Sequence, residues 1–324
     1  MSTYRGIRGT LVSTRTSNPD NPNLGDIWYR SDTGDVQLQV NVAAFSSGGN
    51  MNTARSDLAG AGIQTSAMAL AGYSSPGTRS EVENYDGSSW TEITELNSAR
   101  NSLGAFGATN TAVIACGGRS PTTAATESWN GSAWTEVNDL NAARFAMNIS
   151  GCGTQTSGLT SGGNGNVDNV EVWDGTNWTA AGAEFNTARG QGAQSGQSSS
   201  SAMATGGSPG TPTNTEVWNG TSWTEVGEFN TGRYSQAQSG TPSGALIFGG
   251  ESAPGSQITN TELYDGTSWA EQSDLTTARK DHGGGGHSAN TASIAFAGKA
   301  PPTSFKNETE EWNISATTQK ATVS

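Results

Sequence analysis

Two histidines and two cysteines are the side chains of this protein best suited to metal binding or nucleophilic chemistry. His282 and His287 lie in the stretch KDHGGGGHS, where four glycines separate them. This spacing suits neither one face of a helix nor one face of a strand, so it predicts a flexible loop rather than a shared metal. Cys116 and Cys152 are too few for a disulfide framework and are predicted to be buried free thiols.

Acidic motifs elsewhere in the chain fit a catalytic or calcium site poorly. The turns DGTNW and DGTSW resemble the aspartate boxes of sialidases, but Asp and Gly are adjacent in them and no arginine triad accompanies them. In NPDNPNLGD, Pro22 and Leu24 occupy positions where a calcium loop needs oxygen ligands. We therefore expect a protein that is not an enzyme and that uses no cofactor or metal.

Arginine and glutamate recur at fixed places along the chain. The arginines are spaced 44 to 46 residues apart, and each glutamate stands two positions before an aromatic residue. The residues are Arg55, Arg100, Arg144, Arg189, Arg233 and Arg279, with Glu83, Glu127, Glu171, Glu216, Glu262 and Glu310. A half-buried carboxylate needs a partner and arginine offers two parallel donors, so the pattern favours a ring of buried ion pairs. The alternative is a functional cluster of carboxylates.

The same repeat carries small and aromatic residues. Each unit has a Gly-Gly or Ala-Gly pair followed by a first aromatic residue. In five units a second aromatic follows five positions later, at Trp90, Trp134, Trp178, Trp223 and Trp269. The intervening Asp-Gly and Asn-Gly sequences supply the positive φ angles of a tight hairpin turn. Each unit is therefore predicted to form four antiparallel strands, and no stretch predicts a helix.

Repeating units of this length favour a β-propeller, because a single four-stranded sheet cannot bury both of its faces alone. We expect the small pair where sheets converge and the aromatic pair in the gap between neighbouring sheets. The order of small pair, aromatic residue and tryptophan resembles the kelch repeat over residues 55–312. The resemblance implies an all-β fold, a six-bladed kelch-like propeller with four-stranded antiparallel blades, which we assign to residues 36–324.

The sixth unit lacks its second aromatic residue, because Thr317 stands five positions after Trp312. Phe45 lies ten residues before Arg55, as Trp90 lies ten residues before Arg100. We therefore favour an N-terminal strand at residues 39–46 as the one that closes the sixth blade. The C-terminal stretch TTQKATVS is the competing candidate.

Charge and hydropathy narrow the range of partners. The formal net charge is −13, so a polyanion such as DNA would be repelled by the average surface. The chain has no apolar run of membrane-spanning length and no signal-peptide core at its N-terminus. We expect a soluble protein made in a cytoplasm, with no nucleic acid and no membrane insertion.

Residues 1–35 differ in character from the repeats and predict a loop and a short hairpin. The sequence GDIWYRSDTGDV resembles a short module of tail-fibre and other virion proteins of bacteriophages. The resemblance implies a virion component. Trp28 and Tyr29, as exposed aromatics, are the expected anchor to other virion proteins, because tryptophan and tyrosine are favoured at the centres of protein interfaces. The alternative is a hairpin that only caps the edge of a blade.

The loops after the small pairs vary in length and content between units, and loops of this kind on a rigid scaffold often bind partners. Strand alternation predicts that all six lie on one face. Four basic residues in or near these loops are candidates for binding anionic sugars of a host surface: Arg79, Arg119, Lys299 and Lys306.

Together these features predict a non-enzymatic bacteriophage structural protein, associated with the tail or tail fibre and located in the virion after assembly in the host cytoplasm. Its expected partners are other virion proteins, further copies of itself, and a host glycan or receptor. One alternative is a free glycan-binding or scaffold propeller of a bacterium. Another is a hydrolase or a kelch-type oxidase, although such an oxidase implies a cysteine crosslink near paired histidines, and both cysteines lie far from His282 in the sequence.

Overall fold

The computed structural model describes residues 12–146, 152–302 and 304–321. Every regular element in these ranges is a strand, and no helix occurs among them. No helix long and apolar enough to cross a membrane is therefore present in the described residues. The prediction of an all-β protein is confirmed, although residues 1–11 of the expected N-terminal segment lie outside the described ranges.

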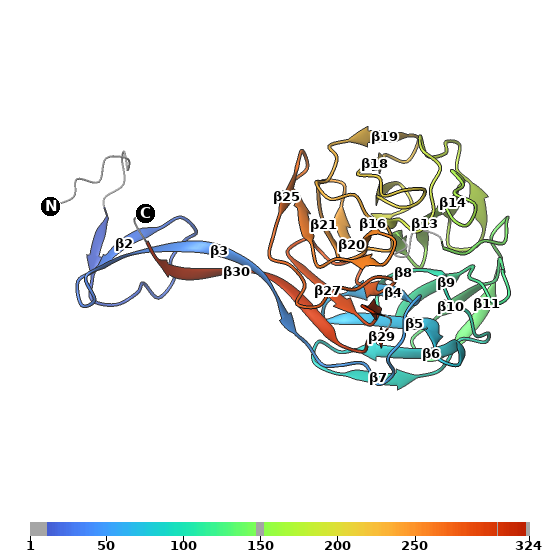
Figure 1. Ribbon diagram of the computed structural model, residues 1–324, viewed down its shortest axis with the longest axis horizontal. Helices are drawn as coiled ribbons and strands as arrows, with labels where there is room; N and C mark the ends of the chain where they lie inside the picture. Colours follow the sequence, from blue (N-terminus) through green and yellow to red (C-terminus); the bar gives the residue numbers. More distant parts are fainter. Residues whose placement is uncertain (1–11, 147–151, 303, 322–324) are drawn as a thin grey trace. The chain divides into compact units, whose positions relative to one another are not determined.

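Five four-stranded antiparallel sheets follow one another along the chain (Figure 1). The first contains β4 (Ala59–Ile63), β5 (Ser66–Ser74), β6 (Gly77–Tyr85) and β7 (Trp90–Ile93). The second contains β8 (Gly104–Thr109), β9 (Ala112–Cys116), β10 (Thr126–Trp129) and β11 (Trp134–Val137). The third contains β12 (Cys152–Thr154), β13 (Ser157–Ser161), β14 (Val170–Trp173) and β15 (Trp178–Ala180).

The fourth sheet contains β16 (Ala193–Ser198), β17 (Ser201–Thr205), β18 (Thr215–Trp218) and β19 (Trp223–Val226). The fifth contains β20 (Ala237–Thr241), β21 (Gly244–Phe248), β24 (Thr261–Tyr264) and β25 (Trp269–Glu271). Two short hairpins lie in loops, β22–β23 (Glu251–Ala253, Ser256–Gln257) and β28–β29 (Lys299–Ala300, Ser304–Phe305). The repeated sheets are consistent with a propeller-like repeat.

A sixth sheet combines both ends of the chain. Its strands are β1 (Ser13–Arg15), β2 (Ile27–Arg30), β3 (Asp35–Ser47), β30 (Thr309–Lys320), β27 (Ala292–Phe296) and β26 (Gly283–Gly284), in that order. It is mixed, because β1 pairs with β2 in parallel. Phe45, near the end of β3, packs on Trp312 with ring centroids 5.2 Å apart. Phe45 thus lies against the first aromatic of its sheet, as Trp90 lies against Tyr85 at 5.0 Å.

The hairpin turn between the last two strands is the same in the first five sheets. The two aromatic residues pair directly across it, for example Tyr85 with Trp90. Only the glycine of each turn has a positive φ, between 94° and 98°. The preceding Asp or Asn instead accepts two backbone N–H groups with its side chain, and at Asp86 these bonds lower the pKa to about 2. The expectation of positive φ at both residues is therefore wrong for the Asp or Asn position.

The apolar core lies between neighbouring sheets. Trp129 and Trp134 of the second sheet pack with Leu70 and Val82 of the first. Equivalent clusters join the second sheet to the third, the third to the fourth, the fourth to the fifth, and the first to β27. The large aromatic residues on the face of each sheet are therefore buried by the neighbouring sheet, because the strands of their own sheet cannot cover them.

The chain divides into two compact units. The smaller contains Met1–Ala43 and Asn313–Ser324, and the larger contains Ala44–Trp312. The expected boundary at residue 35 falls inside the smaller unit, and the inclusion of the C-terminal segment was not anticipated from the sequence. In the larger unit, the sheets lie side by side around a common centre (Figure 1).

Candidate functional site

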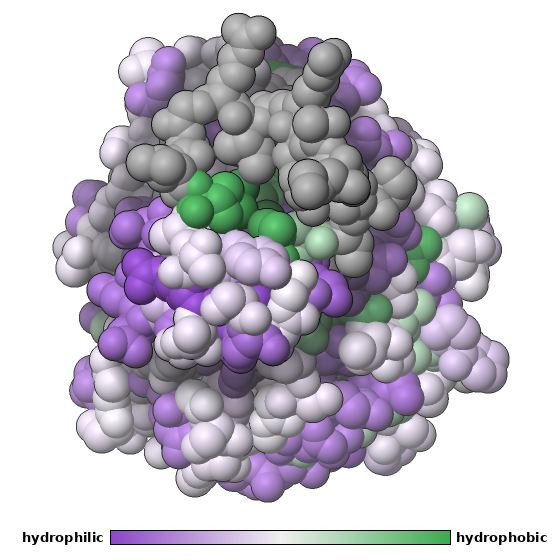
Figure 2. Space-filling view, turned by 90° about the vertical axis from the view of Figure 1, so that its left-hand side faces the viewer, coloured by the Kyte–Doolittle hydropathy of each residue, from purple (hydrophilic) through white to green (hydrophobic). Residues whose placement is uncertain are grey.

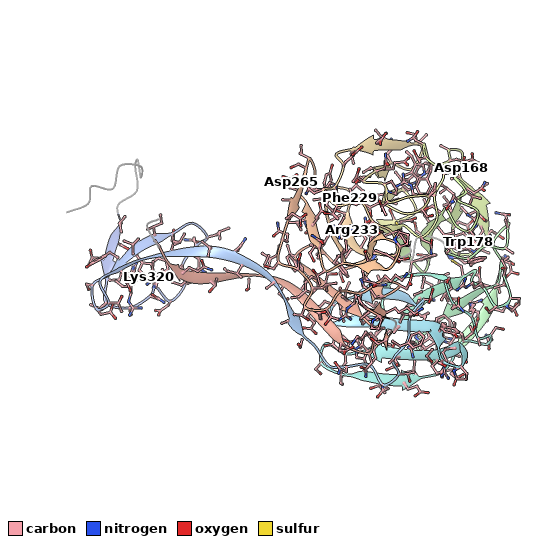
Figure 3. The ribbon with its side chains drawn as sticks, in the orientation of Figure 1. Asp168, Trp178, Phe229, Arg233, Asp265 and Lys320 are labelled. Carbon is pink, nitrogen blue, oxygen red and sulfur yellow. The ribbon has the colours of Figure 1, made fainter. Side chains whose placement is uncertain are left out.

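The repeat arginines and glutamates form six buried ion pairs in the larger unit. Each arginine contacts the glutamate of its own repeat, and every side chain of the set is at most 6% exposed. The N···O distance is 2.9 Å at Arg55–Glu83 and 2.6 Å at Arg233–Glu262. Figure 3 shows Arg233 near Phe229, whose ring centroid lies 5.8 Å from the guanidinium. These glutamates are therefore occupied by their partners and do not form an exposed acidic cluster.

A further residue completes each pair and was missed in the sequence. Three positions before each arginine stands Asn52, Asn97, Asn141, Asn186, Asn230 or Thr276. Its backbone N–H and its side chain both donate to the second oxygen of the paired glutamate. The signal was visible as an amide or hydroxyl at one fixed place in every copy. The role of this residue could not be assigned from the sequence, because it depends on a hydrogen bond from the backbone N–H to the glutamate.

The small pairs have positive φ angles at both positions. The first member has φ between 56° and 68°, a left-handed conformation that alanine can adopt, as at Ala71. The second member has φ between 96° and 138°, and it is glycine in all six repeats. A Cβ at Gly72 would also lie 2.8 Å from the carbonyl oxygen of Ser56. Both conformation and close backbone contact thus explain why only the first position varies.

Six residues, each two positions after a repeat arginine, form a closed circle of backbone hydrogen bonds that we call the amide ring. The N–H of each residue donates to the carbonyl of the equivalent residue in the preceding repeat, and Asp57 donates to Asp281 to complete the circle. The distances lie between 2.7 and 3.1 Å, and all six residues have φ between 50° and 57°. The members are Asp57, Ser102, Ala146, Gln191, Ser235 and Asp281.

A backbone contact within each repeat lies next to the amide ring. Residues directly after the repeat arginines pair with residues directly after the small pairs through backbone contacts, as at Tyr234–Glu251 and Asn101–Arg119. In the third repeat, Phe145 and Asn164 make the corresponding contact through the Asn164 backbone and side chain. The varying loops after the small pairs thus start beside the amide ring.

Two adjoining clefts open among these loops. The first has a volume of about 300 Å³ and is lined by Asp57, Arg119, Phe145, Asn164, Asn166 and Gln191, among others. The second has a volume of about 400 Å³ and is lined by Gln191, Ser208, Thr211, Tyr234, Ser252 and Pro254, among others. Gln191 of the amide ring lines both clefts, so they meet there. Their size is in the range of ligand sites in proteins.

Charged groups around the second cleft are paired with one another. The buried carboxylate of Glu251 accepts hydrogen bonds from the Lys280 ammonium and from the backbone N–H of Gly255. Burial opposes these bonds, but they lower the pKa of Glu251 below its ordinary value. Burial and the nearby Glu251 raise the pKa of Tyr234 to about 12. The tyrosine is therefore a neutral aromatic ring at physiological pH.

The pKa of one acidic residue of the amide ring is raised above its ordinary value. Burial and the charge of Asp57 raise the pKa of Asp281 to about 6, while Lys280 and Lys299 act in the opposite direction. The described residues contain no group of three or more histidine, cysteine, aspartate or glutamate side chains that could hold a metal.

The four predicted basic residues do not form one site. Arg119 lines the first cleft, donates to Asn101 at 2.8 Å, and lies over the ring of Phe145. Lys299 lies over the ring of Phe305. Arg79 is paired with Glu81, and Lys306 with Glu308. Arg79 and Lys306 are therefore not isolated cations.

Trp28 and Tyr29 occupy different environments in the smaller unit. Trp28 is 1% exposed and its Nε1 donates to Asn18 at 3.3 Å, whereas Tyr29 is 37% exposed. The expectation that both rings are exposed is therefore wrong for Trp28, because alternate residues of a strand face opposite sides. Val12 and Leu24 are the other large hydrophobic residues exposed among the described residues. Figure 2 shows scattered hydrophobic side chains on the side of the molecule that it faces.

The histidines and cysteines are mostly interior residues. His282 is fully buried against Phe248, and burial lowers its pKa to about 3. The following Gly283 and Gly284 form strand β26, so the expectation of a loop is wrong for these two residues, whereas residues 285–288 form a turn. Cys116 and Cys152 are buried free thiols as predicted, and burial raises the pKa of each to about 12.

Comparison with protein-family models and with curated proteins finds no match for this chain.

Proposed function

We propose that the larger unit is a six-bladed kelch-like propeller whose sixth blade is closed by the N-terminal strand at residues 39–46. The main support is the amide ring, in which each of six repeats donates one hydrogen bond and accepts one. The strand order β26, β27, β30, β3 supports the closing strand, as does the packing of Phe45 on Trp312 and Phe248.

Truncation tests this closure. Removal of residues 1–47 should lower the melting temperature of the larger unit, because it removes Phe45 from its two aromatic contacts. Removal of residues 1–34 keeps β3 and is the matched control. A chain lacking residues 1–47 that melts like the control would contradict the proposal and favour the C-terminal strand.

We further propose that the protein is a non-enzymatic structural component of a bacteriophage virion, associated with the tail or tail fibre. The observation that carries this proposal is the contrast between the two units. The smaller holds five basic and four acidic residues, and the larger eleven basic and 25 acidic, so their net charges are +1 and −14. All large exposed hydrophobic residues of the described chain also lie in the smaller unit. Such a contrast suits one unit that attaches and another that faces solvent.

The attachment surface that we propose contains Val12, Leu24 and Tyr29. Exposed apolar and aromatic side chains of this kind supply the central contacts of protein interfaces. Trp28 is not part of this surface, since its ring is buried, and it holds the hairpin in place instead. The occupants are other virion proteins or further copies of this chain.

The experiment is quantification of the protein in purified particles by mass spectrometry. A chain with Leu24→Ser and Tyr29→Ser should keep its melting temperature and be incorporated poorly. Tyr73→Ala, in the larger unit, is the control and should be incorporated normally. Absence of the unaltered protein from particles would refute the virion role and favour a free binding propeller of a bacterium. Normal incorporation of the double variant would show that the hairpin is only a cap.

The varying loops beside the amide ring are the proposed receptor-binding face. Of the four basic candidates, Arg119 has the best position, because it lines a cleft. Replacement of Arg79, Arg119, Lys299 and Lys306 by glutamine should leave incorporation intact. Lower adsorption of this variant to host cells would indicate an anionic receptor, and unchanged adsorption an uncharged one.

A further inference from the structure

We infer that the two clefts beside the amide ring form one groove for an uncharged oligosaccharide chain. The groove is defined here by Phe145, Asn166, Gln191, Thr211, Tyr234 and Ser252, which line it. This inference builds on the proposed binding face but not on the virion role, because a groove of this kind would serve a free propeller equally well.

The aromatic residues of the groove stand at one repeated position. The residue directly after each repeat arginine is Ser56, Asn101, Phe145, Gly190, Tyr234 or Lys280. Rings thus occur at this position in the third and fifth repeats, and the fourth repeat between them has a glycine there. A Cβ at Gly190 would lie 2.4 Å from the carbonyl oxygen of Gly163, so this position also excludes other residues. The two rings, with no side chain at the equivalent position between them, provide two stacking surfaces along the groove.

The polar groups between these rings suit hydroxyl groups of a ligand. Within the described residues, no hydrogen bond engages the side chains of Gln191, Thr211 or Ser252. An amide can donate and accept at once, and a hydroxyl can do the same. These are the properties needed to bind the hydroxyl groups of a sugar, while aromatic rings cover its C–H faces.

The electrostatics favour a ligand without charge. Lys280 is paired with Glu251, and Arg119 is held by Asn101 and Phe145. The carboxylate of Asp57 lines the first cleft and would repel an anion. A cationic ligand would meet Arg119 at the same cleft. Arg119 and Asp57 thus place opposite charges on the same cleft, so an acidic or a basic ligand would meet a like charge there as well as an opposite one, and a neutral ligand avoids this repulsion.

The experiment uses the purified full chain and a panel of neutral oligosaccharides of four to six sugar units, with uronic-acid oligosaccharides and unstructured peptides as comparisons. We expect calorimetry to detect binding of at least one neutral oligosaccharide. Its affinity should change little between about 50 mM and about 500 mM salt, because no ion pair with the ligand forms. Tyr234→Ala and Phe145→Ala should each weaken binding by about tenfold or more.

Two further variants separate loss of binding from loss of folding. Tyr73→Ala removes an aromatic residue that lies beside Phe305, outside the groove lining, and should bind like the unaltered protein. Ser252→Trp fills the groove without removing any core side chain and should abolish binding while the melting temperature is kept.

Three results would overturn the inference: binding of no neutral oligosaccharide, binding of the acidic oligosaccharides or peptides alone, or equal affinity of the Tyr234→Ala and Tyr73→Ala variants. If no neutral sugar binds but Ser252→Trp still reduces adsorption of particles, the ligand class is wrong and the proposed binding face stands. If sugar binds but particles lack the protein, the virion role is wrong and the groove stands.

Discussion

Replacement of Glu262 by glutamine isolates the contribution of one buried ion pair. Arg233 and Glu262 are both 0% exposed, and Nη2 lies 2.6 Å from the carboxylate. The other carboxylate oxygen accepts two hydrogen bonds from Asn230. A glutamine has one oxygen, so its NH₂ group must face either the guanidinium or the Asn230 donors. The arginine would then remain buried and charged without a counterion.

The expected cost follows from that arrangement. Burial already lowers the pKa of Arg233, and its remaining N–H groups donate to neighbouring carbonyls, so the side chain cannot leave for solvent cheaply. Removing one partner of a buried pair typically costs about 3–5 kcal/mol of unfolding free energy. Glu308→Gln is the matched control, since the Lys306–Glu308 pair spans 3.6 Å and its side chains are 24% and 43% exposed. That control should cost at most about 1 kcal/mol.

Urea unfolding followed by tryptophan fluorescence measures both variants. The midpoint for Glu262→Gln should fall well below that for Glu308→Gln, with similar slopes. Equal midpoints would show that the buried pair adds nothing beyond an exposed one and would refute the stabilising role of all six pairs.

Three other substitutions test separate features. Trp178→Ala should lower the unfolding free energy by about 3–5 kcal/mol, because the ring is 5% exposed and packs edge-on against Phe106 of the neighbouring sheet; an unchanged melting temperature would contradict the inter-sheet core. Gly72→Ala should lower the unfolding free energy by about 1–3 kcal/mol, whereas Ala71→Gly should not lower it. If calorimetry ranks the two melting temperatures the other way, the positive φ and the close backbone contact of Gly72 are not what requires glycine there. The raised pKa of Asp281 means that the folded state holds this proton more tightly than the unfolded chain, so stability should fall as pH rises from about 4 to about 6. At pH 7 the Asp281→Asn variant should be more stable than the unaltered protein, and its melting temperature should change less with pH. An identical dependence of melting temperature on pH in the two proteins would exclude the raised pKa of Asp281.

The strands of the larger unit could be predicted from the sequence because their signals are local and repeated. A turn residue, a glycine and two aromatics at fixed spacing define a hairpin wherever they occur. The pairing of arginine with glutamate could be predicted because both must be buried near an aromatic layer. The Asn230 position carried the same periodic signal, but its role depends on a backbone N–H that no residue type reveals.

Other features depend on contacts distant in sequence. The glycines after His282 suggested a mobile loop, whereas Gly283 is required because a Cβ there would lie 2.1 Å from the ring of Phe296. The burial of Trp28 depends on Asn18 and on the fold of its unit. The amide ring consists of backbone atoms only, so residues as different as Ala146 and Gln191 occupy equivalent places in it.

The sixth sheet has a consequence for the order in which the protein folds during synthesis. Its strand β3 ends at Ser47, and its partner β30 begins at Thr309. At ordinary translation rates of about 5–20 residues per second, roughly 13 to 50 seconds separate the two. The nascent chain can complete five sheets in turn before Trp312, the packing partner of Phe45, has been synthesised. A chain that ends before Thr309 lacks β30 and therefore cannot join β3 to β27 in the sixth sheet.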